Sequence, residues 1–397
     1  MKNDPLSMYV MGDSQTRSDS LDGGSRIFIE CARRWLNSGM NIYFYTSEEG
    51  YSMLHRYGLK SIKYVVAPSS RYKKLGLYAL YAIRVIKQCA NVLKTSPGTE
   101  NFIIYSGSDF FPDAIPAFLM KMRFRRAKWV AGFYLFASNP FNNETPYKGK
   151  SALKGLIYYM SQLPIYSLVR KNADMVWVTS EPDRYKFIDS RLKQENVVAV
   201  RGGVDTKSPR LVDNPKTKTF DAVFIGRFHP QKGVLELIDI WKIVCKKKKD
   251  AKLAMIGVGE LDGAIKNKIK MNGLDKNVVL FGFKDGLEKI RIFKDSCVVV
   301  HPAIYDSGGM AACEAMACGL PGVSFDLPAL KTYYPKGMVK TSCFDLGHFA
   351  ENILNLLTDK ALYNKTSKDA LELAKEWDWD QRAEDLLIQI EYIRQNK

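Results

Sequence analysis

The sequence alternates short apolar runs with longer amphipathic stretches along most of its length, and this alternation limits the fold more than any other feature. In the first half, the apolar runs that predict strands are 8–11, 41–45, 62–66, 102–105, 128–133, 175–179 and 197–201. Stretches with helical spacing separate them, notably 27–36, 73–93 and 151–172. Strands that alternate with helices in this way predict an α/β fold with a parallel, doubly wound sheet.

A second series of the same kind follows a polar linker. Residues 206–218 read TKSPRLVDNPKTK and contain two prolines, which is typical of a connection between domains. Further strands are predicted at 221–225, 252–256, 278–281, 297–301 and 322–325. The predicted organisation is a first domain at 1–205, the linker, a second domain at 219–376 and a C-terminal helix at 377–397.

The richest motif, HPAIYDSGGMAACEAMACGLPG, lies after the fourth strand of the second series. Asp306 and Glu314 stand eight residues apart, with a turn of Ser307, Gly308 and Gly309 after the first of them. A glycine pair that opens a helix offers backbone N–H groups to a phosphate. A carboxylate two helical turns further on can reach the hydroxyl pair of a ribose, so this spacing suits a nucleotide-linked substrate.

A second motif, GRFHPQKG, follows the first strand of the second domain. Gly226 permits an unusual turn, Arg227 offers a planar fork of donors, and Lys232 adds a point charge five residues later. Two cations at the end of a strand fit a diphosphate leaving group.

Together the two motifs resemble the retaining glycosyltransferases of family 4, the group 1 glycosyltransferases, which have the GT-B fold. The segments DGGS at 22–25 and RGGVD at 201–205 stand where this family has an N-terminal loop and the end of its first domain. The resemblance implies two Rossmann-like domains that face a central cleft, with the C-terminal helix crossing back to the first domain. The first domain would bind the acceptor and the second the nucleotide sugar.

The resemblance also implies a role for each motif residue. Arg227 and Lys232 would neutralise the departing diphosphate, Glu314 would bind the donor ribose, and Asp306 would contact the donor sugar, although this acid is one methylene shorter than the glutamate usual in the family. Positions expected to lie against the donor, through the base, the diphosphate or the N-terminal loop, are Gly23, Gly24, Gly226, Gly257, Phe283, Ser307, Gly308 and Gly309.

Other positions depart from the family or have no catalytic part in this interpretation. The family often places a histidine of the first domain near the donor sugar, but the first domain here has only His55, in a region that does not match, and Ser138 or Asn139 could take its place. We interpret His301 as structural. No pair of acidic residues stands near other residues that could bind a metal. Arg227 and Lys232 already supply the positive charge that Mg²⁺ would, so we expect neither a metal nor another cofactor.

Charge and cysteine content bear on partners and location. The net charge is +17, and residues 51–99 contain no acid but nine cations, which are Arg56, Lys60, Lys63, Arg71, Lys73, Lys74, Arg84, Lys87 and Lys94. Such a surface suits an anionic membrane or is simply solvated, and no motif of a nucleic-acid reader accompanies it. The seven cysteines are scattered, and no signal peptide or membrane-spanning run occurs. We therefore expect a cytoplasmic protein that associates peripherally with a membrane.

The function expected from the resemblance is a retaining, metal-independent transfer of a sugar from a nucleotide-diphosphate donor to a glycan, lipid-linked or close to a membrane. Two alternatives remain open. One is a non-catalytic partner that binds a nucleotide sugar within a glycan-assembly complex. The other is a GT-B epimerase or phosphorylase, although an epimerase would need a different acid/base set. The base, the sugar, the acceptor, the linkage and the oligomeric state stay open.

Overall fold

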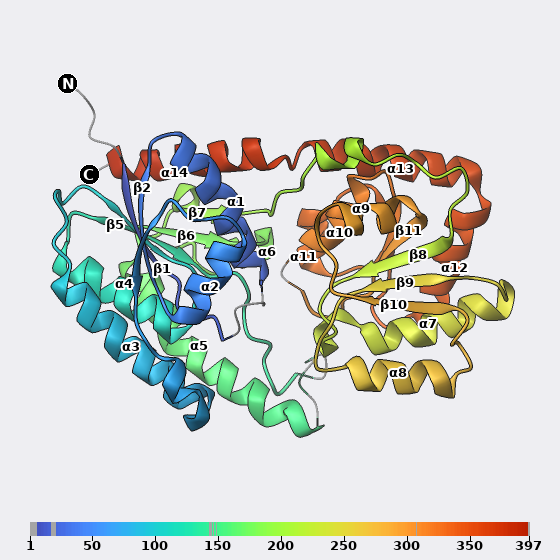
Figure 1. Cartoon of the computed structure of the whole chain (residues 1–397), viewed down its shortest axis with the longest axis horizontal. Coiled ribbons are helices and arrows are strands. Elements are labelled where there is room, and N and C mark those ends of the chain that lie inside the picture. The colour runs from blue at the N-terminus through green and yellow to red at the C-terminus, as the bar shows by residue number, and fades with distance from the viewer. Residues whose placement is uncertain are drawn as a thin grey trace. The chain divides into compact units, whose positions relative to one another are not determined.

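The structure, a computed structural model, describes residues 6–16, 21–142, 145, 147, 149–306 and 308–395. The chain divides into two compact units (Figure 1). Unit 1 comprises Met1–Pro140, Ser151–Gly202 and Trp379–Lys397, and unit 2 comprises Phe141–Lys150 and Gly203–Asp378. These units differ from the predicted domains, because residues 141–150 and 203–205, the predicted linker and residues 377–378 all group with unit 2.

In unit 1, the described strands form one seven-stranded parallel sheet in the order β3-β2-β1-β4-β5-β6-β7. The strands are β1 Ser7–Met11, β2 Asn41–Thr46, β3 Lys63–Val66, β4 Ile103–Ser106, β5 Lys128–Gly132, β6 Met175–Val178 and β7 Val197–Ala199. The order reverses between β1 and β4, where Val10 pairs with Tyr105. The doubly wound sheet that the sequence predicts is confirmed.

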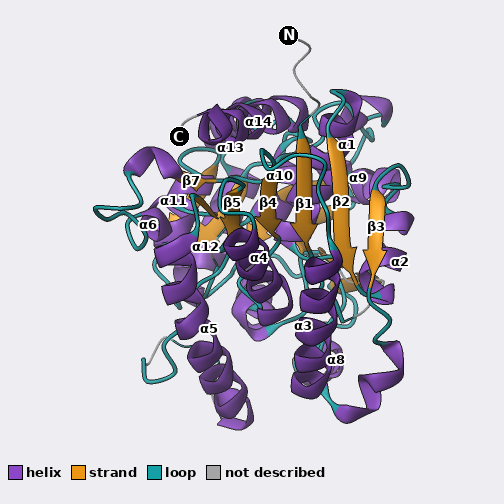
Figure 2. Ribbon diagram, turned by 90° about the vertical axis from the view of Figure 1, so that its left-hand side faces the viewer, coloured by secondary structure: helices purple, strands orange, loops and turns teal. Residues whose placement is uncertain are grey.

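Helices cover both faces of this sheet. They are α1 Gly23–Asn37, α2 Glu48–Arg56, α3 Leu77–Lys94, α4 Phe111–Arg123, α5 Ala152–Asn172, α6 Glu181–Arg184 and α14 Trp379–Gln395, with short 3-10 turns η1 Ser70–Leu75, η2 Gly149–Ser151 and η3 Gln194–Asn196. On one face α4 lies between α3 and α5 (Figure 2). On the other face, the indole N–H of Trp35 in α1 donates to the carbonyl of Ala383 in α14 at 2.8 Å. The C-terminal helix therefore returns to the first unit, as the resemblance implies.

In unit 2, the described strands form a six-stranded parallel sheet in the order β10-β9-β8-β11-β12-β13. The strands are β8 Phe220–Ile225, β9 Leu253–Ile256, β10 Val278–Gly282, β11 Ser296–His301, β12 Gly322–Phe325 and β13 Met338–Thr341. The helices are η4 Ser208–Leu211, η5 Pro230–Lys232, α7 Val234–Lys247, α8 Asp262–Met271, α9 Gly286–Lys294, α10 Met310–Met316, α11 Pro328–Tyr333, α12 Leu346–Thr358 and α13 Lys360–Lys375. Five of the strands were predicted, whereas β13 at the sheet edge was not.

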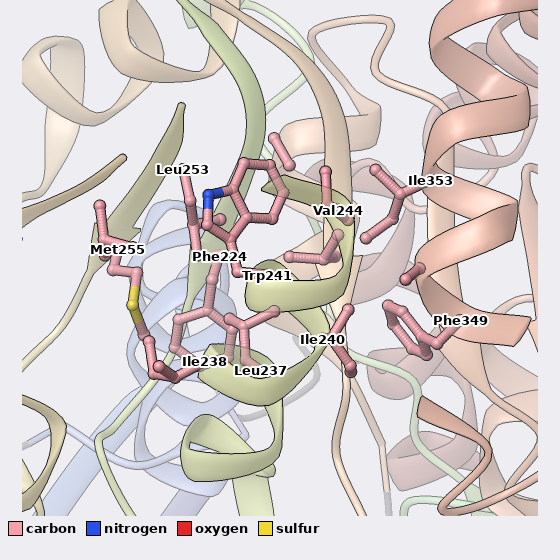
Figure 3. Packing of buried hydrophobic residues seen from close by; sticks show 14 of the residues in the cluster. Phe224, Leu237, Ile238, Ile240, Trp241, Val244, Leu253, Met255, Phe349 and Ile353 are labelled. Carbon is pink, nitrogen blue, oxygen red and sulfur yellow. The ribbon is translucent and has the colours of Figure 1, made fainter. Parts of the chain in front are cut away.

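Alternating side chains of the unit 2 strands feed two separate cores. Phe224, Leu253 and Met255 point to the face covered by α7, α8 and α12, where Trp241 and Phe349 fill the space (Figure 3). Their neighbours along the strands pack against α9, α10, α11 and α13 on the other face. Both faces of a parallel sheet must be buried, and this pattern explains why the strands read as continuous apolar runs in the sequence.

Helix length and hydropathy can be checked against the thickness of a bilayer. Among the described residues, no helix is both long and apolar enough to cross one.

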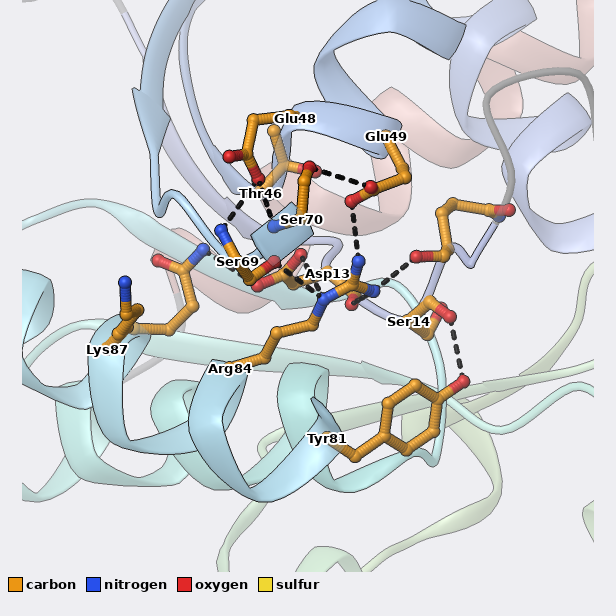
Figure 4. Close-up of polar contacts among 12 residues, drawn as sticks. Asp13, Ser14, Thr46, Glu48, Glu49, Ser69, Ser70, Tyr81, Arg84 and Lys87 are labelled. Atoms are coloured by element: carbon orange, nitrogen blue, oxygen red, sulfur yellow. Dashed lines mark hydrogen bonds and ion pairs between the residues drawn. The ribbon is translucent and has the colours of Figure 1, made fainter. Parts of the chain in front are cut away.

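A buried arginine holds the loop that follows β1. Arg84 of α3 was counted with the surface cations of the sequence, but its side chain is fully buried, so that prediction is wrong for this residue. Its guanidinium lies 2.6 Å from the Glu49 carboxylate and donates to the Asp13 carbonyl at 3.0 Å and to Ser69 Oγ at 3.1 Å (Figure 4). A buried cation needs such a complete set of acceptors. The loop at the carboxyl end of β1 is therefore fixed by a helix 70 residues further along the chain.

Three buried aspartates surround this loop and the end of β4. Burial raises the pKa of Asp13 to about 6, although Arg84 opposes the effect. Burial likewise raises the pKa of Asp109 to about 6 and that of Asp113 to about 8, against hydrogen bonds from Gln162 and from Ser108, respectively. An acid whose pKa is raised by folding stabilises the fold while it is protonated. Its contribution is full below its ordinary value near 3.8 and is lost as the pH rises through the folded value.

We expect Asp113→Asn to make the protein less sensitive to alkaline pH. The amide keeps the oxygen that accepts from the Asp13 N–H, and its N–H can donate to Ser108 Oγ, which in the structure donates to Asp113 Oδ2. The unfolding temperature of the wild type should fall between about pH 4 and pH 8, and that of the variant should fall less. Asp250→Asn, at an exposed aspartate, is the control and should follow the wild type. Parallel curves for wild type and D113N would contradict the assignment.

Candidate active site

The order of the unit 2 sheet reverses between β8 and β11, and the predicted site residues follow these two strands. Arg227 and Lys232 lie in the loop after β8, and Asp306 lies in the loop after β11. Ligands of doubly wound sheets bind outside the carboxyl ends of the strands, at the point where the strand order reverses. The predicted cations and the first predicted acid thus stand at the expected position in unit 2.

Gly233 allows these two loops to meet. Its backbone is left-handed, with φ +62°, and a Cβ atom added there would overlap the carbonyl oxygen of Pro302. The N–H groups of Ile304 and Tyr305 donate to the carbonyl of Gln231 at 3.0 and 3.2 Å. The loop after β8 and the loop after β11 therefore form one joined surface.

Lys232 and Asp306 form an ion pair on this surface. Lys232 Nζ lies 2.5 Å from Asp306 Oδ2, and the side chains are 19% and 10% exposed. The N–H of Gly308 donates to Asp306 Oδ1 at 3.3 Å. His301, which we expected to be structural only, places Nε2 3.4 Å from Asp306 Oδ2, a long separation without good hydrogen-bond alignment.

The pair determines the charge state of the cluster. Burial favours the neutral acid, but the positive charge of Lys232 outweighs it and holds the pKa of Asp306 well below its usual range. Burial lowers the pKa of His301, because it penalises the charged imidazolium, so this ring is neutral at pH 7. At neutral pH the cluster therefore contains an ionised Asp306, a charged Lys232 and a neutral His301.

The glycine pair after Asp306 lies against aromatic rings. A Cβ atom on Gly308 would lie 2.8 Å from Tyr333 Cζ, and one on Gly309 would lie 2.7 Å from Tyr334 Cε2. Helix α10 begins at the next residue, Met310. Only glycine fits at both positions, so the backbone N–H groups that open α10 stay uncovered by side chains of their own. The third predicted turn residue, Ser307, lies outside the described residues.

The loops after β8, β9 and β10 stand next to each other. Gly226 N–H donates to the carbonyl of Ile256, and Gly257 N–H donates to the carbonyl of Gly282, at 3.0 and 2.9 Å. A Cβ atom on Gly257 would overlap the carbonyl oxygen of Gly226. Phe283, which follows Gly282, is 61% exposed, and Arg227 is also exposed. These two side chains are accessible to a ligand at the strand ends.

Glu314 has a partner that the sequence analysis missed. Lys289 of α9 places Nζ 2.9 Å from Glu314 Oε2 and 2.9 Å from Asp285 Oδ1, and the lysine is only 8% exposed. Burial disfavours its charge, but the two carboxylates raise the pKa of Lys289 above its ordinary value. The i,i+4 spacing of Asp285 and Lys289 could have indicated their own pair, whereas nothing in the local sequence points from Lys289 to Glu314.

The two predicted N-terminal glycines belong to unit 1 and form no loop. Gly23 and Gly24 are the first residues of α1, which begins four residues before the predicted helix, because Asp22 Oδ1 caps it by accepting from Ser25 N at 2.9 Å. A Cβ atom on Gly24 would lie 2.6 Å from Tyr134 Cδ2. Packing of α1 against the loop after β5 thus explains Gly24. Ser138, in that same loop, is buried.

Metal ligands were not predicted. Within the described ranges, no three His, Cys, Asp or Glu side chains gather in a way that could hold a metal ion. Independence from metals stays a prediction.

In a comparison with known protein families, much of unit 2 matches one family. Residues 209–373 match the family described as glycosyl transferases group 1. The chain is 24% identical over 210 residues to the poly(glycerol-phosphate) alpha-glucosyltransferase of Bacillus subtilis, covering 52% of this chain and 31% of that protein. It is 27% identical over 193 residues to the phosphatidyl-myo-inositol mannosyltransferase of Mycobacterium leprae, covering 46% and 50%. The match thus spans at most half the length of either relative.

Solved structures share the fold over the whole chain. TarM of S. aureus, solved with fondaparinux, alpha-GlcNAc-glycerol and UDP, superposes with a TM-score of 0.72 at 14% identity and covers 97% of this chain and 99% of its own. The GT-B architecture of two Rossmann-like domains is therefore confirmed.

The ion pair at the switch point can be tested by a double-mutant cycle. Lys232→Met leaves a buried carboxylate without its cation, so we expect a lower unfolding temperature, whereas Asp306→Asn should cost less. The double variant should be more stable than the sum of the two single effects predicts, with a coupling free energy of about 1–3 kcal/mol in urea unfolding. Lys249→Met, at an exposed lysine in the turn before β9, is the control. Additive effects of K232M and D306N would show that the pair does not form.

Proposed function

We propose that the chain transfers a sugar from a nucleoside-diphosphate donor to a hydroxyl group of an acceptor, since residues 209–373 match the family described as glycosyl transferases group 1. The observation that carries this proposal is the meeting of Lys232 and Asp306 beside the N–H of Gly308 at the switch point of unit 2. Positive charge and backbone donors at this place suit a diphosphate.

The chemistry follows from the charge that develops on the leaving group. When the bond between the sugar C1 and the phosphate oxygen breaks, negative charge grows on the diphosphate. Lys232 and Arg227 would stabilise that charge more in the transition state than in the ground state. Asp306 would hold the Lys232 ammonium in place, since it lies only 2.5 Å away. Glu314 would accept hydrogen bonds from the donor ribose, and Phe283 would lie beside the base.

We further propose that the transfer retains the anomeric configuration and needs no metal ion. The acceptor oxygen would bond to C1 on the face that the phosphate leaves, and its proton would pass to the departing phosphate oxygen. The motifs shared with retaining family 4 enzymes support this assignment. One relative is named an alpha-glucosyltransferase, and TarM was solved with UDP, which makes a UDP-sugar the first donor to test.

A nucleotide-sugar screen in the presence of EDTA tests the donor and the metal together. We expect one donor among UDP-, GDP-, ADP- and dTDP-sugars to raise the unfolding temperature, with a stabilisation of about 2.7 kcal/mol at ~100 times its Kd. Donor hydrolysis or transfer should follow without metal, and NMR of the product should show the donor's anomeric configuration. Lys232→Met should weaken the binding of that donor, whereas the control Lys249→Met should not.

Each step of this experiment has an outcome against the proposal. If none of the donors changes the unfolding temperature, the assignment of unit 2 is wrong. If a donor binds but is neither hydrolysed nor transferred to lipid or glycan acceptors, the chain is a nucleotide-sugar-binding partner. Activity that appears only after a divalent metal is added would refute metal independence.

We propose that unit 1 associates with an anionic membrane surface through η1 and α3. Helix α3 buries Leu80, Arg84, Gln88 and Val92 and exposes several other apolar side chains. The exposed apolar side chains of η1 and α3 are Leu75, Leu77, Tyr78, Ile86 and Leu93, and the exposed cations include Arg71, Lys73, Lys74 and Lys94. Apolar side chains with lysines and arginines around them suit the boundary between headgroups and acyl chains. An acceptor in or near the membrane, such as a lipid-linked glycan, would then be within reach.

Vesicle sedimentation tests this surface. We expect binding to vesicles of phosphatidylcholine with phosphatidylglycerol, none to phosphatidylcholine alone, and a loss at high salt. Lys74→Glu should weaken binding about tenfold, because each cation near an anionic surface contributes ~1 kcal/mol and the new charge is repelled. Ile86→Ser should also weaken it, whereas Met271→Ser, at an exposed methionine of unit 2, should not. Equal binding to neutral vesicles, or no sedimentation at low salt, would contradict the proposal.

A further inference from the structure

Lys289 is a buried cation that joins two elements of unit 2. It lies in the first half of α9, is 8% exposed, and points to two carboxylates on different elements. Asp285 is the residue before α9, at the end of the loop that carries Phe283. Glu314 lies on α10. The ammonium therefore ties the loop after β10 to α10.

Glu314 can still accept hydrogen bonds at its second oxygen, and this distinguishes the contact from an ordinary structural ion pair. Lys289 is bound to Oε2, while Oε1 accepts no hydrogen bond from any described residue. The Glu314 side chain is 23% exposed, so this second oxygen is accessible. A carboxylate that is fixed through one oxygen and open at the other is oriented to accept from a ligand hydroxyl.

We propose that Lys289 is a positioning residue for the ribose of the nucleoside-diphosphate donor, which acts by holding the Glu314 carboxylate in a fixed orientation. This inference rests on the proposed function of the site. Lys289 would not touch the donor, because its side chain is only 10% exposed and its Nζ already donates to the two carboxylates. Its second partner, Asp285, anchors the end of the loop 283–285. Lys289 would thus also fix the distance between the element for the base, Phe283, and the element for the ribose.

The geometry gives the inference a specific signature. If Lys289 acts through Glu314, the loss of Lys289 should weaken the contribution of the ribose hydroxyls to the affinity. The contribution of the diphosphate to the affinity should not change. A donor analogue without one ribose hydroxyl reports this part directly. If Lys289 is only structural, its loss should weaken the binding of all nucleotides equally or should lower only the stability of the protein.

The experiment measures Kd by calorimetry for UDP, GDP and ADP and for their 2′-deoxy counterparts, with the full chain. We expect the wild type to prefer one ribonucleotide over its deoxy counterpart by about tenfold or more, as expected when a carboxylate loses a hydroxyl partner. Lys289→Met should reduce that preference to about twofold, and Lys289→Arg should keep most of it. The control is Lys268→Met, which removes another ion-paired lysine of unit 2, 2.5 Å from Asp239, and should leave the preference unchanged.

A double variant links the effect to Glu314. In the Glu314→Gln background, Lys289→Met should change the ribose preference no further, because the group through which it acts is already altered. Circular dichroism and unfolding temperatures show which variants are folded, and Asp285→Asn, which leaves the pair with Glu314 in place, serves if K289M is not. That variant loosens the lysine and should reduce the ribose preference in part, whereas an unchanged preference would contradict the inference.

The possible outcomes distinguish a failure of the proposed function from a failure of the role of Lys289. If the wild type binds neither these three nucleotides nor dTDP, the proposed function fails, and this inference fails with it. If it binds dTDP alone, which has no 2′-hydroxyl, the inference alone is wrong. If the wild type shows a ribose preference and folded K289M keeps it, Lys289 is only structural and the inference alone is wrong. Further loss of the preference on adding K289M to E314Q would show that Lys289 acts by another route.

Discussion

The contact between Gly233 and the carbonyl oxygen of Pro302 sets the arrangement of unit 2. A side chain at residue 233 would overlap that oxygen, so only glycine lets the two loops at the switch point approach each other. The hydrogen bonds to the Gln231 carbonyl and the ion pair between Lys232 and Asp306 then form across the joint. The order of the strands brings the loops to the same edge of the sheet, but this close approach turns two neighbouring loops into one charged surface.

The fold could be predicted from the sequence because its signal is repeated and local. Each parallel strand buried on both faces gives a continuous apolar run, and the described strands β8 to β12 lie within two residues of their predicted limits. The strand β13 escaped because MVKT is short, lies at the edge and contains a lysine. The start of α1 was also misplaced, because the cap formed by Asp22 allows two glycines into the first helical turn.

The site could be predicted only in part, since motifs name residues but not their partners. The sequence pointed to Lys232, Asp306 and Glu314, and the structure brings the first two together. The partner of Glu314 is Lys289, 25 residues earlier, and no local pattern connects them. The misinterpretation of Arg84 has the same origin. A cation in a stretch without acids predicts a solvated surface, and its carboxylate partner, Glu49, precedes that stretch. Pairs of distant charges depend on the fold itself.

The two charged clusters of unit 2 have net charges of opposite sign. This difference agrees with the chemistry of a nucleotide sugar, which has an anionic diphosphate and a neutral ribose. Around the switch point, Lys232 and the exposed Arg227 exceed the single charge of Asp306. On α9 and α10, the two carboxylates exceed the charge of Lys289. A diphosphate requires the first environment, and a ribose, whose hydroxyls donate hydrogen bonds, requires the second. In both clusters a partner already compensates much of the buried charge. Each can therefore exist without a ligand at an acceptable cost in folding free energy and still offer the sign of charge that one end of the donor needs.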